Sequence, residues 1–332
     1  MNMNAAGVVP VPRPVVQVDK IQEAEKRVDR KRNDPKAKYA LACHYIDKKE
    51  PIPALALLQS TLKNKESASK VSTKKIKAKI KECSKKVEEQ AKVISKVAKE
   101  VKFKGDITKL AKGKVPKKLK AIVKKQDTLL PVEVALIRLF TSAGQDYFSV
   151  LNAYLRNEMP FLELMIKLKK VGKEVTLSFL KESASVLKHC LKKMPSLEKL
   201  YPKPKEVEKR TVFRGMSMTL AQIQKLQKEM KFENEGFASN SQSMKVAVDF
   251  TPQKTTAVEP VLFVTEGRTG VPIHKLSKIE SEKEVLFAPG TAFKISEIKK
   301  VTKDDAFAKQ IHKFSSKFTH LWVVRMQEQS VN

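Results

Sequence analysis

The spacing of hydrophobic positions changes about two thirds of the way along the 332-residue chain. Before residue 211, apolar residues recur every three or four positions, which is the period of an amphipathic helix. After it, short runs rich in Val, Ile and Phe alternate with Gly and Pro turns, as β-strands do. The expected strands are Thr211–Met216, Val261–Thr265, Val285–Phe287, Phe293–Ile298 and Leu321–Val324, with helices at Leu220–Met230 and Ser243–Phe250.

Helices first and strands afterwards predict an α+β domain, in which a helical lobe packs on an antiparallel core. Its helical lobe is expected from stripes of apolar residues at Pro131–Leu139, Tyr147–Leu155, Phe161–Leu168 and Val175–Leu191. We therefore predict three parts. They are a disordered segment at 1–18, an all-α basic region at 19–128, and the α+β domain at 129–327.

The basic region contains two predicted helical elements. Residues 19–64 combine small and large apolar residues, with Ala42 and Ala54 at positions where two helices would touch closely. This pattern fits either one tetratricopeptide-like helix pair or an ordinary helical hairpin, and one repeat alone cannot bury its own face. A long amphipathic helix follows, and its apolar positions are Ile76, Ile80, Val87, Ala91, Ile94, Val97 and Val101. After this helix, Gly105, Gly113 and Pro116 mark a linker.

The charge is concentrated in one segment. Residues 61–125 hold 23 Lys and 6 acidic residues, more than half of the net charge of +31 that the whole chain carries. Such a block can bind a phosphate polyanion, an anionic membrane surface or an acidic partner, or it can be a solvated helix face. Its only aromatic residue is Phe103, and it lacks the Arg-rich, aromatic or Gly-rich modules that bind nucleic acid.

Several classes of protein are disfavoured by the composition. No apolar stretch reaches the length that crosses a bilayer, and the first twenty residues lack the continuous apolar core of a secretory signal. The cysteines Cys43, Cys83 and Cys190 lie far apart, without a Cys-x-x-Cys pair. This spacing favours a reducing compartment and argues against a metal site.

Three short motifs in the last third carry candidate chemistry. Arg214 and Gly215 follow Phe213, Ser239 and Ser241 flank Asn240, and Glu282 and Glu284 flank Lys283. Together they supply a cation for phosphate, hydroxyls that can orient a carboxylate, and two carboxylates. We expect Glu282 and Glu284 on one strand, whose period of two places both side chains on one face while Lys283 points away.

The order of these motifs resembles the mono-ADP-ribosyltransferases that act on arginine. The similarity extends to the Val-Leu-Phe run and the Pro-Gly-Thr turn after Glu284, and to the helical segments 135–141 and 150–156. It covers about residues 129–327 and leaves the first 128 outside. The resemblance implies an antiparallel β-sandwich that binds NAD as a substrate, without a metal. The middle residue of the family's Ser-Thr-Ser motif is Asn240 in this chain.

The resemblance also implies catalytic roles for the carboxylates. Glu284 would hydrogen-bond the ribose 2'-hydroxyl and stabilise the oxocarbenium-like sugar as nicotinamide leaves. Ser239 would orient Glu284. Glu282 would bind the planar guanidinium of the acceptor and help to remove its proton.

Further residues are assigned to NAD binding. Arg214 would hold the phosphates or the adjacent ribose, and Gly215 would let the backbone approach the nicotinamide amide. Ser241 belongs to the same cofactor-binding set. Phe250 is a candidate ring over nicotinamide, with a core position as the alternative.

Two other functions remain open at this point. The first is an NAD glycohydrolase with the same residues, in which water intercepts the sugar. The second is a non-enzymatic protein that binds polyanions through the Lys-rich block and carries a degenerate transferase domain. For the transferase, the resemblance implies a bacterial effector or toxin that reaches a host cytoplasm without a cleaved signal peptide, and the alternative is an enzyme of the bacterial cytoplasm. The target protein is expected to present an accessible arginine.

Overall fold

The computed structural model describes residues 34–63, 72–100, 106–117, 119–120, 129–141, 145–160, 175–253, 255, 257–277, 279–311 and 314–329, with short pieces at 23–24 and 27–28. The chain divides into two compact units, Met1–Ser84 and Lys85–Asn332. The segment 1–18, predicted to be disordered, lies outside the described residues.

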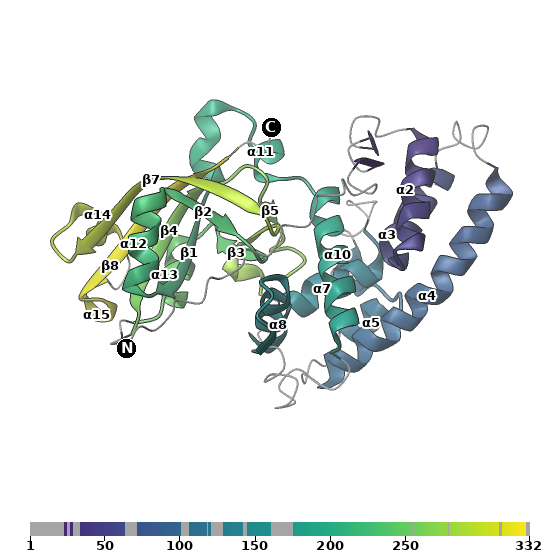
Figure 1. Cartoon of the computed structure of the whole chain (residues 1–332), viewed down its shortest axis with the longest axis horizontal. Helices are drawn as coiled ribbons and strands as arrows, with labels where there is room; N and C mark the ends of the chain where they lie inside the picture. The colour runs from purple at the N-terminus through teal and green to yellow at the C-terminus, as the bar shows by residue number, and fades with distance from the viewer. Residues whose placement is uncertain are drawn as a thin grey trace, which may run out of the picture. The chain divides into compact units, whose positions relative to one another are not determined.

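The first unit contains a pair of helices, α2 (Pro35–Asp47) and α3 (Pro51–Lys63), which pack against each other (Figure 1). Asp34 caps α2, because its side chain accepts a hydrogen bond from the Lys36 amide at 2.9 Å. Ala42 and Ala54 are both fully buried, as expected for close helix contact. The described residues thus contain the predicted helical hairpin, whereas a tetratricopeptide relationship stays a prediction.

The long amphipathic helix is confirmed as α4 (Thr73–Glu100). Its apolar face is buried at Ile76, Cys83, Ile94 and Val97. The predicted position Val101 lies outside the described residues. In place of a plain linker, a short helix α5 (Asp106–Ala111) follows, and the chain then turns at Gly113 with φ +76°.

The helical part of the second unit comprises α7 (Pro131–Phe140), α8 (Gln145–Leu155), α10 (Leu177–Lys193) and the short α11 (Leu197–Leu200). A fully buried carboxylate, Glu133 of α7, joins α7 to α10 through a 2.6 Å ion pair with Lys193. Burial raises the pKa of Glu133, and the ammonium group opposes that shift. The predicted helix at 161–168 lies outside the described residues.

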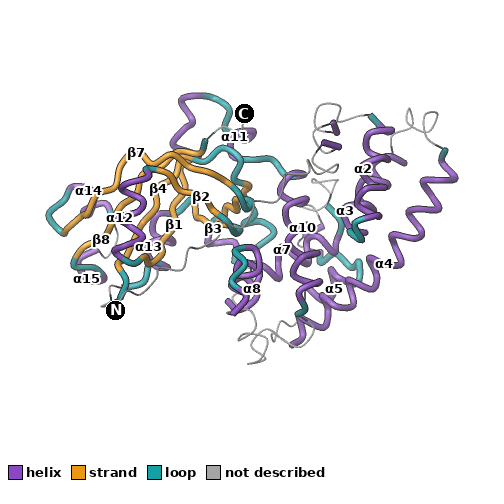
Figure 2. The backbone as a smooth tube through the Cα atoms, viewed as in Figure 1, coloured by secondary structure: helices purple, strands orange, loops and turns teal. Residues whose placement is uncertain are grey.

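The strands, drawn in orange in Figure 2, form one eight-stranded sheet in the order β2-β7-β8-β4-β1-β3-β6-β5. Every pairing is antiparallel except that of β4 with β8. The five predicted strands are confirmed, and β2, β3 and β5 are additional strands that the hydrophobic pattern does not indicate. Their bounds are β1 (Thr211–Met218), β2 (Lys231–Asn234), β3 (Ala238–Ser241), β4 (Glu259–Glu266), β5 (Val271–Pro272), β6 (Glu284–Phe287), β7 (Thr291–Thr302) and β8 (His320–Glu328).

The two faces of the sheet form two cores, as alternation along β4 requires. Val261 and Phe263 lie in a core with α12 (Leu220–Glu229), whereas Leu262 and Val264 lie in a core with α13 (Met244–Phe250), α14 (Ala306–Gln310) and α15 (Phe314–Lys317). Although β6 and β7 are far apart in the strand order, the rings of Phe287 and Phe293 lie 5.6 Å apart. The sheet therefore curls so that distant strands share one core, and the α+β class is confirmed.

Among the described residues, no helix combines the length and hydrophobicity that a membrane crossing requires.

Candidate functional site

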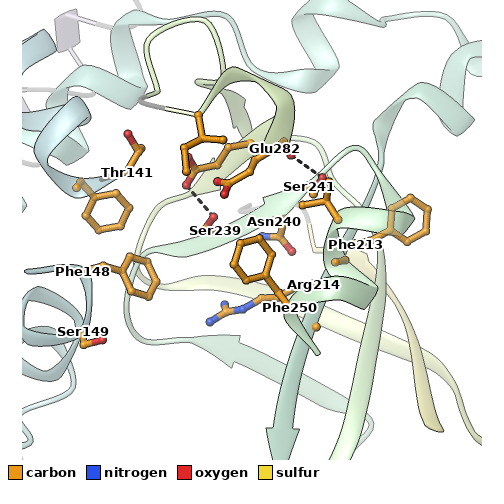
Figure 3. Close-up of a pocket in the computed structure, with 16 residues that line it drawn as sticks. Thr141, Phe148, Ser149, Phe213, Arg214, Ser239, Asn240, Ser241, Phe250 and Glu282 are labelled. Atoms are coloured by element: carbon orange, nitrogen blue, oxygen red, sulfur yellow. Dashed lines mark hydrogen bonds between the residues drawn. The ribbon is translucent and has the colours of Figure 1, made fainter. Parts of the chain in front are cut away.

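The three sequence motifs converge on one cavity of about 400 Å³, a volume within the range of small-molecule sites. They come together because β1, β3 and β6 are neighbours in the sheet. Figure 3 shows Arg214 reaching into the cavity from β1, with Thr141 and Phe148 on the helical side. The lining residues are Phe140, Thr141, Phe148, Ser149, Phe213, Arg214, Gly215, Ser239, Asn240, Ser241, Val246, Ala247, Phe250, Ile279, Glu282 and Glu284.

Glu284 lines this cavity on the side formed by β3 and β6, which we call the floor. The residue is only 5% exposed. The Ser239 hydroxyl donates a 2.7 Å hydrogen bond to its Oε1 (Figure 3). Within the described part of the chain, no group hydrogen-bonds its Oε2. Burial, together with the nearby charge of Glu282, raises the pKa of Glu284 to about 7, although hydrogen bonds from the side chains of Ser239 and Ser277 oppose the rise. This carboxylate is thus held at one oxygen and can accept a hydrogen bond from a bound ligand at the other.

The expectation that Glu282 shares a strand with Glu284 is wrong. Glu282 ends a 3₁₀ helix, η3 (Glu280–Glu282), and Lys283 follows in a left-handed conformation with φ +48°. Strand β6 begins only at Glu284. Both carboxylates nevertheless line the same cavity. Glu282 is half-buried, and burial raises its pKa.

Arg214 supplies the positive charge of the cavity. Burial and, to a smaller extent, repulsion from the guanidinium of Arg156 together lower its pKa to about 10. At neutral pH it therefore stays charged. Arg156, at the end of α8, also makes a 2.6 Å ion pair with Glu158. Two like charges near one cavity are typical of an anion site. The sequence motifs alone missed Arg156, although it stands in the segment 150–156 that carries the family resemblance.

Packing of the chain gives a reason of its own for a glycine at position 215. A Cβ atom there would lie 2.0 Å from Thr251 Oγ1 and 2.2 Å from the Ala247 carbonyl oxygen. The absent side chain therefore lets β1 pack against the end of α13. Gly215 also lines the cavity, so an approach of its backbone to nicotinamide stays a prediction.

Ser241 is committed to the backbone. Its hydroxyl donates to the Glu282 carbonyl at 2.7 Å and accepts from the Ser243 amide at 2.9 Å. The amide of Asn240, which replaces the family's central Thr, donates to the Ala238 carbonyl at 3.1 Å. These contacts shape the wall of the cavity, and direct NAD binding by Ser241 stays a prediction.

The ring of Phe250 is 59% exposed and borders the cavity, so the alternative of a core position is wrong. Lys317 holds the backbone next to this ring by donating to the Val248 and Asp249 carbonyls at 2.6 and 2.8 Å.

The helical lobe also supports the cavity from behind. Asn152 of α8 donates to the Phe237 carbonyl at 3.1 Å and accepts from the Phe237 amide at 2.7 Å. A Cβ atom at Gly236 would collide with the Asn152 side chain at 2.6 Å. This two-way contact fixes the entry to β3, the strand that carries Ser239. Asn152, Phe148 and Thr141 are not among the site residues that the sequence motifs predict.

Within the described residues, no cluster of three or more His, Cys, Asp or Glu side chains could hold a metal ion.

The family model of the NAD:arginine ADP-ribosyltransferases matches residues 148–315, just over half of the chain. The chain belongs to this family. The match includes all three motifs, and it supports a transferase that uses NAD as its substrate. No curated protein sequence matches the chain.

Solved structures with a similar fold include ADP-ribosyltransferases of bacteria. The Vis toxin from Vibrio splendidus is 20% identical, with a TM-score of 0.43, over 70% of this chain and 91% of that chain. HopU1 of Pseudomonas syringae is 15% identical, with a TM-score of 0.42, over 72% of this chain and 97% of that chain. Exoenzyme S from Pseudomonas aeruginosa, solved with human 14-3-3 protein beta and carba-NAD, is 16% identical, with a TM-score of 0.38, over 67% of this chain and 88% of that chain. At these values the likeness says nothing about the target of this transferase.

Proposed function

We propose that this transferase moves ADP-ribose from NAD to an arginine side chain of a target protein and releases nicotinamide. The observation that supports it best is the pair of carboxylates in one cavity. Glu284 is buried, with one oxygen bonded to Ser239 and the other without a partner among the described residues, whereas Glu282 is half-exposed beside it.

Glu284 would act on the bond between ribose and nicotinamide. The ring nitrogen of nicotinamide leaves with the electron pair of that bond, and positive charge develops on the sugar. The ionised Glu284 would stabilise this charge and accept a hydrogen bond from the ribose 2'-hydroxyl at Oε2. The low exposure of its side chain strengthens the electrostatic effect, because water would otherwise screen it.

Arg214 and Arg156 would hold the pyrophosphate of NAD. Burial is the main cause of the lowered pKa of Arg214, and repulsion from Arg156 is the second cause, which an anion between the two guanidinium groups would relieve. The exposed ring of Phe250 would stack on nicotinamide. This role is supported by the position of Phe250 in the lining of the cavity.

Glu282 would receive the acceptor. A planar guanidinium matches a carboxylate in charge and shape. As the guanidinium nitrogen bonds to the sugar carbon, one of its protons must leave, and the Glu282 carboxylate would accept that proton. The raised pKa of Glu282 suits a group that takes up a proton in the reaction.

The experiment compares nicotinamide release with labelling of an acceptor. The protein is incubated with labelled NAD and either an arginine-containing or a lysine-containing peptide. We expect labelling of the arginine peptide alone. Glu284→Ala should lose both nicotinamide release and labelling, whereas Glu282→Ala should lose labelling and keep part of the hydrolysis.

Glu280→Ala is the matched control, because Glu280 is an exposed carboxylate in the same turn that does not line the cavity. It should behave as the wild type does. Equal labelling by the wild type and Glu284→Ala would end the enzymatic proposal. Nicotinamide release without labelling of any arginine acceptor would favour the NAD glycohydrolase instead.

The Lys-rich block 61–125 is proposed to bind an acidic partner or a phosphate polyanion. In its support, α4 buries its apolar face and exposes lysines such as Lys77, Lys85 and Lys92 on the other side. Binding to heparin that weakens steeply with added salt would support this role. Action as a bacterial effector or toxin, inside a host cytoplasm or otherwise, stays a prediction.

A further inference from the structure

Glu282 lies on a segment that connects β5 to β6, which we call the strap and define as residues 276–283, with residue 278 outside the description. In the strap, η3 is the one regular element among the described residues. Glu282 therefore owes its position to the contacts that hold the two ends of the strap.

The far end of the strap is held by β3. The Ser241 hydroxyl donates to the Glu282 carbonyl at 2.7 Å, and the Gln242 amide donates to the Lys283 carbonyl at 3.1 Å. The same strand places Ser239 against Glu284. This anchor ties the end of the strap to the floor of the cavity.

The near end is held by a helix that lies far away in the sequence. Nη1 of Arg138, on α7, donates to the carbonyls of Leu276 and Ser277, each at 3.2 Å. Arg138 is only 4% exposed. A guanidinium in such a place is costly unless it is hydrogen-bonded, so these carbonyls are part of what lets the charge be buried there.

Arg138 is one of two buried charged residues on α7. The other buried side chains of α7 are apolar except for Glu133. A well-packed apolar residue in place of a buried charge is often neutral or stabilising. What the arginine adds is a directed bond to the backbone of the strap, since one nitrogen reaches two successive carbonyls.

We infer that Arg138 is a positioning residue that aims Glu282 at the acceptor, and so sets how much of the cleaved NAD is transferred to arginine and how much is hydrolysed. The inference rests on the proposed function. Arg138 does not line the cavity, so its effect must act through the strap. Glu284 is held mainly by β6 and by the Ser239 hydroxyl, with the Ser277 side chain as a weaker partner, so cleavage of NAD should fall less than transfer when the Arg138 contact is lost.

The test uses the full chain with Arg138→Met, which keeps the length of the side chain and removes the donors, and Arg138→Lys, which restores one donor group. Nicotinamide release and labelling of an arginine peptide are measured together. For Arg138→Met we expect labelling per nicotinamide released to fall at least about tenfold. Its KM for NAD should stay within about threefold, and its KM for the arginine peptide should rise. Arg138→Lys should recover part of the ratio.

Arg210→Met is the matched control, because Arg210 is also mostly buried and bonds a side chain, Glu266, at 3.3 Å outside the cavity. It should keep the wild-type ratio even if its melting temperature falls. Loss of labelling and nicotinamide release by the same factor in Arg138→Met would mean a merely structural role and would overturn the inference. If that variant does not fold, Arg138→Gln, which is shorter and uncharged, takes its place, and a wild-type ratio in Arg138→Gln would overturn the inference equally.

Labelling by the wild type distinguishes a failure of the proposed function from a failure of the role of Arg138. Absence of arginine labelling by the wild type contradicts the proposed function itself. Labelling by the wild type with an unchanged ratio in the Arg138 variants contradicts only the role of Arg138.

Discussion

The floor of the cavity and the strap hold the carboxylates of Glu284 and Glu282 in different ways. Glu284 on the floor belongs to a strand with hydrogen-bonded neighbours on both sides, β3 and β5, and its side chain is fixed by Ser239. Glu282 on the strap stands on a single turn, between a 3₁₀ helix and a left-handed residue. A group on a paired strand is fixed by the whole ladder, whereas a group on a turn depends on a few contacts. The comparison suggests that cleavage of NAD and choice of acceptor can be altered separately.

The largest effect is expected from pH, and it acts on the floor. The pKa of Glu284 is raised to about 7 by burial, and the reaction needs its ionised form. The kcat/KM for nicotinamide release should therefore rise with pH and level off above about 7, with about a tenfold loss per pH unit well below it. A profile that is flat between pH 5 and 8 would contradict the assignment of Glu284.

The same shift has a consequence for stability. Because the folded-state pKa lies above the unfolded one, Glu284 favours folding fully below about 4.5 and loses that contribution as pH rises through about 7. Glu284→Gln carries no such charge. Its melting temperature should exceed that of the wild type by more at pH 8 than at pH 5.

Ser239→Ala should have the next largest effect. It removes the Ser239 hydrogen bond to Glu284 Oε1, the stronger of two side-chain hydrogen bonds that favour the ionised form. A bond to a charged group contributes about 1.5 to 3 kcal/mol, which corresponds to about a 10- to 100-fold loss. Nicotinamide release and arginine labelling should fall together, and the midpoint of the pH profile should move upward. A change in labelling alone would break the distinction between floor and strap.

Ser241→Ala should act on the strap, and less strongly. It removes a neutral hydrogen bond to the Glu282 carbonyl, which contributes about 1 kcal/mol or about fivefold. Labelling per nicotinamide released should fall by about that factor, while hydrolysis in the absence of an acceptor stays near the wild-type rate. Ser243→Ala is a suitable comparison, since the side chain of Ser243 does not cap α13. Equal losses in the two reactions would show that Ser241 serves the floor as well.

Phe250→Ala should give the smallest effect, and on NAD binding alone. With a ring that is 59% exposed, its loss should change the free energy of unfolding by less than about 0.5 kcal/mol. The KM for NAD should rise severalfold, and Phe250→Tyr should restore it because the ring face is kept. An unchanged KM in Phe250→Ala would remove this residue from the NAD site.

The order of helices and strands could be predicted from hydrophobic spacing, because burial imposes a period on each element wherever that element lies. The long helix α4 and strands β1, β4, β6, β7 and β8 are examples. Strands β2, β3 and β5 could not be predicted in this way, because β2 and β3 are short and mostly polar and β5 is a two-residue strand at the edge of the sheet. Their pairing partners, and not their own composition, make them strands.

The residues of the site could also be predicted from the sequence, since motif and order identify Arg214, Ser239, Glu282 and Glu284. What the motifs could not show is how a turn at Lys283 replaces the expected strand, why position 215 must be glycine, or that Arg138 supports the strap. Those features depend on contacts between segments far apart in the chain. The sequence by itself determined the elements and the chemical groups, because these follow from local periods and side-chain types. Only the tertiary structure decided their mutual geometry, since long-range packing sets which backbone atoms meet.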